Sequence, residues 1–392
     1  MLPTDSDPNI ALEERRQTQR LRKLKSVVSI SPRELWCDGK IYLNFSSNDY
    51  LGLSQHPLIK QRAIEYINRY GVGSGSSRLV SGNNVIYESL EARLAELKGS
   101  EAALVFSSGY QLNSTILPVL ASVAGNFLCD HLVHNSLLTG AINSKAGFHR
   151  FRHNDCRDLE RRLAEIKTKN ATGWIVTQSV FGMDGDLASL DEITTLGADA
   201  GFHLFVDEAH ATGVFGENGM GLVSSSGDNK VVMGTFGKGC GSFGAYVTCS
   251  EQMKDYLVNF CSGFIYTTAL PPPVLGAIEA ALELIPKMEQ ERQQLLQLAH
   301  ETRAALTSLG FAVGNSASQI IPVIVGTDAN AISLSDWLLG HQIYVPAIRP
   351  PTVPDGTARL RLSLSALHSP TDIAKLVSVL KQWQPCEAIP SS

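Results

Sequence analysis

At 392 residues the chain exceeds the size at which one hydrophobic core stops growing, so its length favours two packed domains over one. Hydrophobic residues make up 44% of the chain and charged residues 18%, which is enough apolar material for a large core. The net charge of -5 lacks the basic excess that binding to nucleic acid or to an acidic membrane would need, so neither partner is expected.

The cysteines and the apolar runs of the sequence indicate the cellular location of the protein. The 7 cysteines are scattered without a Cys-x-x-Cys pair, which argues against a disulfide framework and against a thiolate metal site. The N-terminus carries polar residues and then the charged run 13–16, where a secretory signal would have an apolar stretch. Prolines and glutamates interrupt the longest apolar stretch, residues 263–285. We therefore expect a cytoplasmic protein without a membrane span.

The first part of the chain, residues 1–49, is predicted to be an N-terminal arm. Within it, residues 11–26 mix Leu12, Leu21 and Leu24 with many charged side chains. Leucines spaced in this way among charges are typical of a short amphipathic helix. We expect one such helix in the arm.

Residues 50–285 repeat a short apolar run, a turn rich in Gly, Ser, Asn and Asp, and a helical stretch. This alternation is typical of an α/β fold with a mostly parallel central sheet flanked by helices. In such sheets ligands bind outside the carboxyl ends of the strands. We expect this segment to be the large, ligand-binding domain, with strands at residues 102–106, 127–129, 174–177, 203–206, 231–234 and 245–248.

The last part of the chain, residues 286–392, is predicted to be a smaller α+β domain. One long helix from about residue 272 through 310 is expected to lead into it. The domain would then hold strands near residues 319–325, 343–345 and 359–363 and a helix over residues 370–383.

A lysine among glycines, Lys238 in the run 235–241, is the most informative residue. An amine on backbone without side chains can form an imine with a flat aldehyde cofactor. Asp207 follows an expected strand, and its carboxylate could pair with a pyridine nitrogen and hold it protonated. His210 could reach the phenolic oxygen of the ring, and His134 could stack on it. Together these residues indicate a pyridoxal-phosphate enzyme with Lys238 as the Schiff-base lysine.

A strand followed by small residues and a helix, at residues 106–111, predicts an anion site. Backbone N–H groups and the helix dipole there favour a phosphate. Ser108 and Gly109 would contact the cofactor phosphate, and Tyr110 would lie beside the ring. The hydroxyls of three threonines could complete the phosphate shell, namely Thr235, Thr267 and Thr268.

Other functions compete for the same residues. Asp207 opens an Asp-Glu-Ala-His run that is also the spelling of a helicase box, but the chain lacks the Walker loop such a motor needs. A metal site with His131, His134 and Asp207 would rest on an i, i+3 pair without a further tight cluster. Arg359 and Arg361 share one face of an expected strand, which fits either a carboxylate clamp or a solvated basic edge.

Nearly the whole chain, from Leu43 to His368, resembles the α-oxoamine synthases, a family of fold-type I pyridoxal-phosphate enzymes. The resemblance runs through residues 43–53, 71–82, 180–186 and 207–216 and the lysine loop. It implies the fold-type I architecture, a homodimer with shared active sites, and a decarboxylating condensation of an amino acid with an acyl thioester. The stretch 347–354, Ala-Ile-Arg-Pro-Pro-Thr-Val-Pro, is most similar to the branch that condenses L-alanine with pimeloyl-CoA or its carrier-protein form in biotin synthesis.

The resemblance also implies roles for single residues. Lys238 would hold the cofactor as an internal aldimine, with Asp207 at the pyridine nitrogen, His210 at the phenolic oxygen and His134 on the ring. Asn48 and Arg361 would bind the carboxylate of the amino acid. Arg22, Arg349 and Thr352 would meet the acyl substrate, Ser77 would favour alanine over glycine, and Thr267 and Thr268 would reach the phosphate of the neighbouring subunit.

Two positions depart from the family pattern, and two rival functions stay open. Gln178 stands where the family usually has Glu, and Gly182 where it usually has Ser. One rival is a sister activity, such as glycine C-acetyltransferase, 5-aminolevulinate synthase or a long-chain acyl condensation with serine. The other is a cofactor-free accessory subunit, which the presence of Lys238 disfavours.

Overall fold

The computed structural model describes residues 7–167, 171–223 and 229–386, and these form two compact units. The large unit consists of residues 48–182 and 186–293. The small unit joins the residues before 48, the segment 183–185 and the residues from 294 onward. The N-terminal segment thus belongs to the same unit as the C-terminal residues, and the sequence-based boundaries at 49/50 and 285/286 stay predictions.

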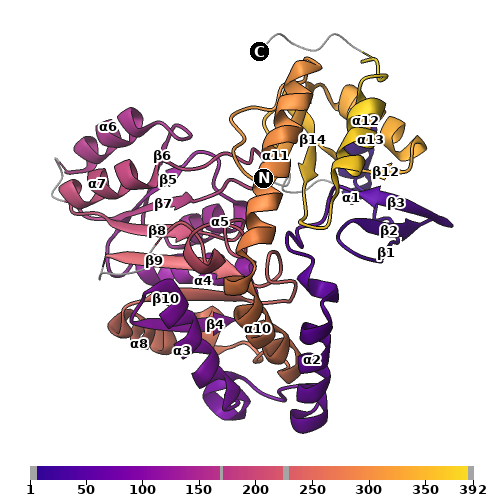
Figure 1. Cartoon of the computed structure of the whole chain (residues 1–392). Coiled ribbons are helices and arrows are strands. Elements are labelled where there is room, and N and C mark those ends of the chain that lie inside the picture. Colours follow the sequence, from indigo (N-terminus) through magenta and orange to yellow (C-terminus); the bar gives the residue numbers. More distant parts are fainter. Residues whose placement is uncertain (1–6, 168–170, 224–228, 387–392) are drawn as a thin grey trace. The chain divides into compact units, whose positions relative to one another are not determined.

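A seven-stranded sheet with the order β4-β10-β9-β8-β7-β5-β6 lies at the centre of the large unit (Figure 1). The pairs that join β9, β8, β7, β5 and β6 are parallel, while β10 runs antiparallel to both β4 and β9. The expectation of a mostly parallel sheet is confirmed. The strands are β4 (Ala102–Phe106), β5 (Asn126–Asp130), β6 (Gly147–Phe151), β7 (Trp174–Gln178), β8 (His203–Asp207), β9 (Lys230–Thr235) and β10 (Ala245–Cys249).

Helices cover both faces of this sheet because its strands are apolar on both sides. Phe205 of β8 packs with side chains of α4, α5 and α8, whereas its neighbours Leu204 and Val206 pack with those of α6 and α7. Figure 1 shows helices on either side of the strands. The helices of the large unit are α2 (Pro57–Tyr70), α3 (Ile86–Lys98), α4 (Gly109–Leu120), α5 (Asn135–Asn143), α6 (Cys156–Lys167), α7 (Leu190–Ala200), α8 (Glu251–Phe260), α9 (Ser262–Ile265) and α10 (Pro272–Leu284).

The prediction of one helix over residues 272–310 is wrong. Helix α10 ends at Leu284, a short 3₁₀ turn (Ile285–Lys287) follows, and α11 (Glu289–Ser308) begins beyond it. Pro286 explains the break, because proline lacks an N–H group and its ring clashes with the preceding helical turn.

Two smaller sheets belong to the small unit. One has the order β1-β2-β3-β12 and the other the order β11-β14-β13. The strands are β1 (Val28–Ser29), β2 (Glu34–Cys37), β3 (Lys40–Asn44), β11 (Ile320–Gly326), β12 (Ile343–Tyr344), β13 (Ala347–Ile348) and β14 (Ala358–Ser363), and the helices besides α11 are α1 (Pro8–Gln17), α12 (Asp328–Gly340) and α13 (Pro370–Leu380).

The amphipathic helix expected over residues 11–26 is shorter and begins earlier. Helix α1 starts after Asp7, whose side chain accepts a hydrogen bond from Asn9 N, and it ends at Gln17. Gln19 has a φ of 57°, a left-handed conformation that cannot continue the helix. The second half of the predicted helix is therefore wrong.

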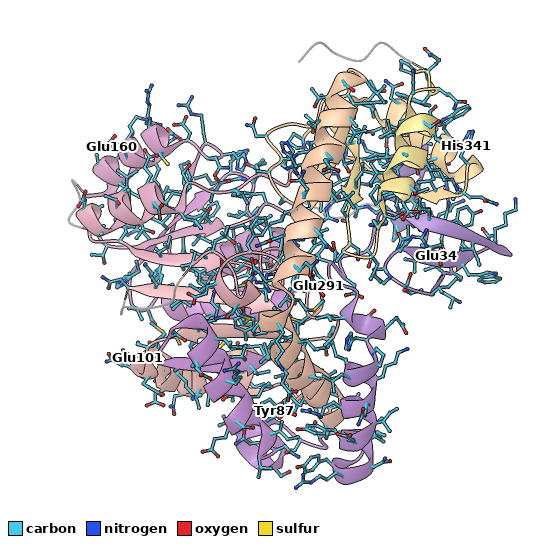
Figure 2. The ribbon with its side chains drawn as sticks, viewed as in Figure 1. Glu34, Tyr87, Glu101, Glu160, Glu291 and His341 are labelled. Carbon is cyan, nitrogen blue, oxygen red and sulfur yellow. The ribbon has the colours of Figure 1, made fainter. Side chains whose placement is uncertain are left out.

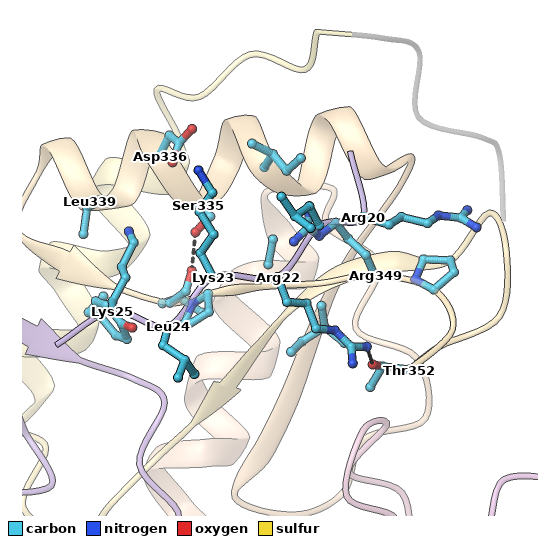
Figure 3. A pocket seen from close by; sticks show the side chains of 18 residues that line it. Arg20, Arg22, Lys23, Leu24, Lys25, Ser335, Asp336, Leu339, Arg349 and Thr352 are labelled. Carbon is cyan, nitrogen blue, oxygen red and sulfur yellow. Dashed lines mark hydrogen bonds between the residues drawn. The ribbon is translucent and has the colours of Figure 1, made fainter. Parts of the chain in front are cut away.

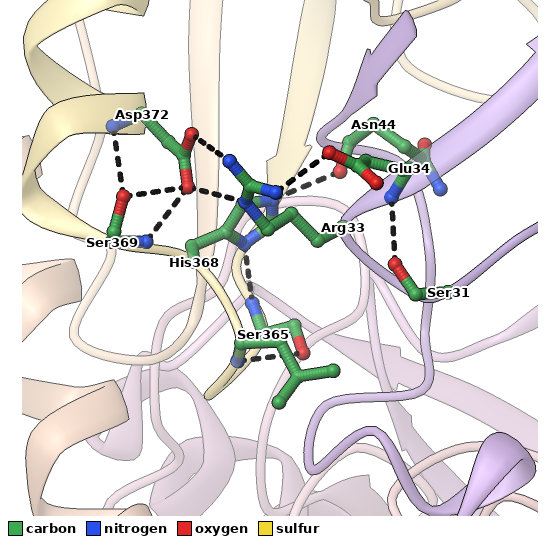
Figure 4. Close-up of polar contacts among 9 residues, drawn as sticks. Ser31, Arg33, Glu34, Asn44, Ser365, His368, Ser369 and Asp372 are labelled. Atoms are coloured by element: carbon green, nitrogen blue, oxygen red, sulfur yellow. Dashed lines mark hydrogen bonds and ion pairs between the residues drawn. The ribbon is translucent and has the colours of Figure 1, made fainter. Parts of the chain in front are cut away.

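A polar cluster joins the N-terminal segment to α13 within the small unit (Figure 4). The guanidinium of Arg33 donates to both oxygens of Asp372 at 2.7 and 2.8 Å. His368 donates from Nε2 to Asn44 O at 3.0 Å, because its Nδ1 accepts from Ser365 N at 2.9 Å. The cluster ties segments more than 300 residues apart in sequence into one unit.

No described helix of the chain is both long enough and apolar enough to cross a membrane.

Candidate active site

The predicted site residues of the large unit gather at the carboxyl edge of its sheet. Asp207 is the last residue of β8 and pairs in register with Gln178, the last residue of β7. Side chains alternate between the faces of a strand, so Asp207 points to the same face as Phe205, which packs with α4 and α5. Asp207 therefore faces these two helices, and it is buried.

Both oxygens of the Asp207 carboxylate accept hydrogen bonds. Ala209 N donates to Oδ1 at 2.9 Å, and Asn113 Nδ2 donates to Oδ2 at 2.9 Å. The amide of Asn113 also donates to Ser136 Oγ at 3.0 Å. The carboxylate is thus fixed in orientation at the strand end where the sequence predicts it.

His134 follows β5 and caps α5. Its Nδ1 accepts from Ser136 N at 3.2 Å and lies 2.7 Å from Ser136 Oγ, while its backbone N–H donates to Gln178 Oε1 at 2.8 Å. Burial lowers the pKa of His134; the charge of Asp207 opposes this effect and that of Lys238 adds to it. The imidazole is therefore neutral near pH 7.

Lys238 lies in the loop after β9, and its amine contacts a predicted partner. Lys238 Nζ lies 3.0 Å from His210 Nε2, and His210 Nδ1 lies 2.7 Å from the Tyr50 hydroxyl. Tyr50 donates in turn to Asn48 Oδ1 at 3.2 Å. A chain of polar contacts thus runs from Lys238 to His210, from His210 to Tyr50 and from Tyr50 to Asn48.

Two glycines let the lysine loop pack closely on neighbouring backbone. A Cβ on Gly239 would lie 2.4 Å from Thr212 O. Gly241 has a φ of +62°, and a Cβ there would lie 2.3 Å from Ser54 N. Side chains at these positions would push the loop away, so the glycines set the position of Lys238.

The predicted anion site forms at the start of α4. Ser108 caps this helix by accepting a hydrogen bond from Gln111 N at 3.3 Å. A Cβ on Gly109, the first helical residue, would lie 4.0 Å from Thr235 Cβ, so the helix start adjoins Thr235. Thr235 Oγ1 donates to Gly244 O at 2.9 Å. The free N–H groups of α4 and the Thr235 hydroxyl thus lie side by side.

Tyr110 extends from α4 toward α5. Its ring meets the His134 ring edge-on, with 6.5 Å between the centroids, and its hydroxyl donates to Asn135 Oδ1 at 3.3 Å. The ring is half exposed. Tyr110 therefore lies beside His134, the residue that is predicted to stack on the cofactor ring.

The glycine-rich loop at residues 71–82 contacts the two later threonines. Ser77 forms an antiparallel bridge with Thr268, whose carbonyl accepts from Ser107 Oγ at 3.2 Å. Tyr87 on α3, labelled in Figure 2, accepts a hydrogen bond from Leu270 N at 2.8 Å and fixes the end of this segment. Thr267 and Thr268 thus lie next to the start of α4 in their own chain, and their reach to another subunit stays a prediction.

Glu208, the neighbour of Asp207, has a structural role. It forms an ion pair with Lys98, and both side chains are buried. Lys98 also donates to Met220 O at 2.8 Å and to Val223 O at 2.9 Å, so all three of its hydrogens are used. This ion pair holds the loop after β8 in place. Glu208, the second acid of the Asp-Glu-Ala-His run, therefore has a structural role, and the run does not require the function of a helicase box.

Three predicted substrate residues of the small unit, Arg22, Arg349 and Thr352, border a cavity of about 520 Å³ (Figure 3). Arg22 donates to Thr352 Oγ1 at 2.8 Å, and Arg349 donates to Gln19 O. Lys23 and Lys25 also line the cavity. Its lining thus carries several cationic side chains beside the carboxylate of Asp336.

The two arginines of β14 differ in their partners. Arg359 forms an ion pair with Asp184, which holds the segment 183–185 in the small unit. Arg361 donates to Ser363 Oγ at 2.7 Å and is 9% exposed. A clamp made of both arginines is therefore not formed, and Arg361 alone stays predicted for a carboxylate.

Sequence reasoning missed three residues that contact predicted ones: Tyr50, Asn113 and Ser136. Asn113 had a signal only in its helical spacing, since it lies three, four and seven positions before the apolar Ile116, Leu117 and Leu120 of α4. Ser136 lies two positions after His134, but only the structure shows that it bonds that ring. Among the described residues, no group of three or more His, Cys, Asp or Glu side chains is arranged to hold a metal ion.

Comparison with known proteins assigns the family. Residues 40–380 match the family Aminotransferase class I and II. The chain is 47% identical over 371 residues to 8-amino-7-oxononanoate synthase of Gluconacetobacter diazotrophicus, which covers 92% of this chain and 93% of that relative. The chain belongs to the α-oxoamine synthase family. The resemblance predicted from the sequence is confirmed.

Solved structures agree with this assignment. A serine palmitoyltransferase with pyridoxal phosphate as its internal aldimine superposes with a TM-score of 0.87 and 28% identity, covering 96% of each chain. An 8-amino-7-oxononanoate synthase from Francisella tularensis gives a TM-score of 0.75 and 27% identity, covering 87% of this chain and 97% of that one. The fold-type I architecture expected for this α-oxoamine synthase is thus confirmed.

The cofactor of this α-oxoamine synthase is pyridoxal phosphate, and the residues present fit it. The loop after β9 carries an amine at Lys238, and the end of β8 carries a buried carboxylate at Asp207. The start of α4 offers free N–H groups beside Gly109, where no side chain stands in the way. An amine, a carboxylate and an anion site are the three groups that this cofactor requires.

Proposed function

We propose that the enzyme condenses L-alanine with a pimeloyl thioester and releases 8-amino-7-oxononanoate, carbon dioxide and the free thiol of the donor. One observation carries the chemistry: Lys238 Nζ lies 3.0 Å from His210 Nε2, in a loop beside the buried Asp207. The relatives that bear the name 8-amino-7-oxononanoate synthase, at 42% to 48% identity over most of the chain, support the choice of substrates.

Four residues would hold the cofactor at its ring, and others its phosphate. Lys238 would bind its aldehyde carbon, Asp207 its pyridine nitrogen and His210 its phenolic oxygen, with His134 on the ring. Ser108, Gly109 and Thr235 would hold the phosphate. The bound cofactor supplies an electron sink that stabilises negative charge at the α-carbon of the amino acid.

Lys238 is the residue suited to move the α-proton. Its amine lies 3.0 Å from His210 Nε2, and His210 Nδ1 lies 2.7 Å from the Tyr50 hydroxyl, so the imidazole holds the amine in place. A primary amine held in this way takes a proton from carbon when neutral and returns it later. Asn48 and Arg361 would orient the substrate carboxylate, so that the α C–H bond faces the amine.

The cationic cavity of the small unit suits the acyl donor. Arg22, Lys23, Lys25 and Arg349 line it, and Ile332 and Leu339 give it apolar walls. A pimeloyl thioester combines an aliphatic chain with the phosphates of its pantetheine carrier, and arginine and lysine are suited to phosphate. The donor would be CoA or a carrier protein, since both present this arm.

We propose a homodimer as the assembly. Exposed apolar side chains surround the glycine-rich loop and the segment after α9, with Val72 73% and Tyr266 84% exposed. Apolar side chains grouped in this way are typical of a contact surface. The shared active site and the cytoplasmic location stay predictions.

The substrates are tested by measuring thiol release over a matrix of amino acids and thioesters. Purified enzyme loaded with pyridoxal phosphate would receive alanine, glycine or serine with pimeloyl, acetyl or palmitoyl thioesters. We expect alanine with the pimeloyl thioester to exceed every other pair. Serine with the palmitoyl thioester is the rival that the structural relatives suggest. A higher rate for another pair would overturn the assignment.

The role of Lys238 is tested by Lys238→Ala. We expect kcat to fall at least about a hundredfold, because the loss of a positioned base alone accounts for about 100- to 10,000-fold. Lys254→Ala on α8 is the matched control and should keep full activity. A Lys238→Ala variant that retains activity would contradict the mechanism.

A further inference from the structure

Two buried residues without a predicted role connect Asp207 to His134. Asn113 on α4 donates to Asp207 Oδ2 and to Ser136 Oγ, and Ser136 on α5 contacts His134 Nδ1. We infer that Asn113 and Ser136 are positioning residues, which orient the Asp207 carboxylate and hold His134 as the tautomer protonated on Nε2. The inference rests on the proposed function only in its cofactor roles for Asp207 and His134.

The amide of Asn113 sets the direction of the whole chain of hydrogen bonds. An asparagine amide has two N–H donors, and here one binds the carboxylate at 2.9 Å and the other the serine hydroxyl at 3.0 Å. Both acceptors are oxygens and the carboxylate has no proton to give, so the donor end of the amide must face them. The side-chain amide of Asn113 therefore cannot rotate by half a turn without losing both hydrogen bonds.

The hydroxyl of Ser136 passes this direction on to His134. Because the Ser136 oxygen accepts from Asn113, its own hydrogen is available for His134 Nδ1 at 2.7 Å. The backbone N–H of Ser136 also points to Nδ1, at 3.2 Å. A ring nitrogen that meets two donors must be the unprotonated one, so the proton of the neutral imidazole is on Nε2.

The consequence concerns the charge beside the cofactor. Burial lowers the pKa of His134, so the ring is neutral near pH 7. A neutral imidazole does not place a second positive charge next to a pyridine ring that Asp207 keeps protonated. The Nε2–H group of His134 then serves as a hydrogen-bond donor whose direction is fixed.

Stability alone gives a poor explanation for Asn113. The residue is 2% exposed on an otherwise apolar helix face, and its Oδ1 has no hydrogen-bond partner among the described residues. Burying an amide oxygen in this way is unfavourable, and an apolar residue of similar shape would fill the position without that penalty. The polar side chain is therefore better explained by what it does to Asp207 and Ser136.

The tautomer is measured by nitrogen NMR of the histidine rings, with 15N-histidine in the cofactor-loaded enzyme. His134→Gln identifies the signals of His134 among the 10 histidines. In the unaltered enzyme we expect Nε2 to carry the proton and Nδ1 to have none. Ser136→Ala removes the hydroxyl but keeps the backbone N–H of residue 136, so it should shift the Nδ1 signal and raise the share of the Nδ1-protonated tautomer. The matched control Ser114→Ala, which removes a hydroxyl that donates to Gln111 O, should change neither.

The effect on Asp207 is measured by cofactor affinity. Asn113→Ala should weaken the binding of pyridoxal phosphate about tenfold, as expected for the loss of one hydrogen bond to a charged group. Asn113→Asp, which keeps the shape but replaces the donor by an acceptor, should weaken it further. Thermal melting confirms that each variant is folded. Ser136→Ala should lower kcat for the condensation and leave KM for alanine within about twofold, because Ser136 acts through the ring of His134 and does not itself bind alanine.

The outcomes separate this inference from the proposed function. A His134 ring protonated on Nδ1 in the unaltered enzyme, or ring-nitrogen signals of His134 that are unchanged in Ser136→Ala, would overturn the inference whatever the substrate. Unchanged cofactor affinity in folded Asn113→Ala and Asn113→Asp would overturn the part that concerns Asp207. Failure of alanine and the pimeloyl thioester as substrates would refute the proposed function but leave the NMR and affinity results valid.

Discussion

Tyr50 places one hydroxyl between two predicted site residues. It is fully buried, and its oxygen lies 2.7 Å from His210 Nδ1 and donates to Asn48 Oδ1 at 3.2 Å. With its hydrogen donated to Asn48, the hydroxyl oxygen is placed to accept from His210 Nδ1 in the shorter bond. The other ring nitrogen of His210 is then unprotonated and can accept from Lys238.

The variant Tyr50→Phe tests this arrangement. It removes only the oxygen, so the ring still fills the core, and we expect the free energy of unfolding to fall by about 1 kcal/mol. His210 would lose its fixed tautomer, and kcat should drop about tenfold because one oriented hydrogen bond is lost. Thermal melting and steady-state kinetics measure the two effects. Tyr70→Phe on α2 is the matched control, and equal kinetics in both variants would contradict the role of Tyr50.

The two departures from the family pattern have different weight. Gln178 keeps an acceptor, since its Oε1 receives the backbone N–H of His134 at 2.8 Å, so the loss of charge leaves this contact intact. Gly182 matters more, because a Cβ there would lie 2.4 Å from His210 Nε2. A serine at this position would require His210 to move. The glycine thus permits the observed contact between His210 and Lys238.

At the scale of elements, the close packing of α4 and α5 brings Asn113 to Ser136. Gly140 on α5 makes this possible, because a Cβ there would lie 2.4 Å from Asn113 O and 3.2 Å from Leu117 Cβ. The backbone of α4 cannot give way as a flexible side chain could. The two helices approach each other at the point where the polar contacts cross between them.

We expect Gly140→Ala to push α4 and α5 apart. Overpacking of this kind destabilises a protein by about 1 to 3 kcal/mol, and cofactor affinity should fall with it because Asn113 moves. Urea unfolding and cofactor titration measure these effects. Gly340→Ala at the end of α12 is the control, since nothing lies within 4 Å of its Cβ, and it should be neutral or slightly stabilising. An equally stable Gly140→Ala would show that the helices are not in tight contact.

The elements that the sequence predicted well are those with a simple apolar pattern. Six strands of the large sheet were expected within two residues of their bounds at either end, because each is a buried apolar run. Strand β6 was missed, since it is an edge strand whose first four residues are partly exposed and include His149 and Arg150. The prediction of one long helix was wrong at Pro286. Proline is a local signal for a helix break, but the apolar periodicity on both sides of it was given more weight.

The site residues likewise fall into those that the sequence predicts and those that it does not. Lys238, Asp207 and His210 are close to strand ends or glycines, so their neighbours in sequence reveal them. Asn113 and Ser136 act through residues of other elements, and such contacts depend on how helices pack. Sequence spacing carries no information on this packing, which is why the positioning residues could not be predicted.

At the scale of the whole molecule, each unit contains a histidine with a displaced pKa. In the large unit His153 lies 2.9 Å from Asp130 Oδ1 and 2.7 Å from Asp186 Oδ2. Burial alone would lower the pKa of His153, but the hydrogen bonds to both carboxylates outweigh it and raise the pKa to about 10. The stability that this charge provides is complete below pH 6.5 and is lost as the pH rises toward 10.

His368 of the small unit behaves in the opposite way. It is buried and stacks on Phe45 with 4.5 Å between ring centroids. Burial lowers its pKa to about 4, which the hydrogen bond to Asn44 O only partly offsets. The folded protein resists protonation of this ring, so stability is complete above pH 6.5 and is lost as the pH falls toward 4.

These two histidines predict opposite pH slopes for two variants. The loss of melting temperature caused by His153→Gln should be largest below pH 6.5 and shrink toward pH 10, where the unaltered protein has lost the same contribution. The loss caused by His368→Gln should be largest above pH 6.5 and shrink toward pH 4. Calorimetric melting from pH 4 to 10 measures both, with His300→Gln at an exposed position of α11 as the matched control. Parallel slopes for the two variants would mean that these rings do not carry the charges assigned to them, because only a charged His153 and a neutral His368 give slopes of opposite sign.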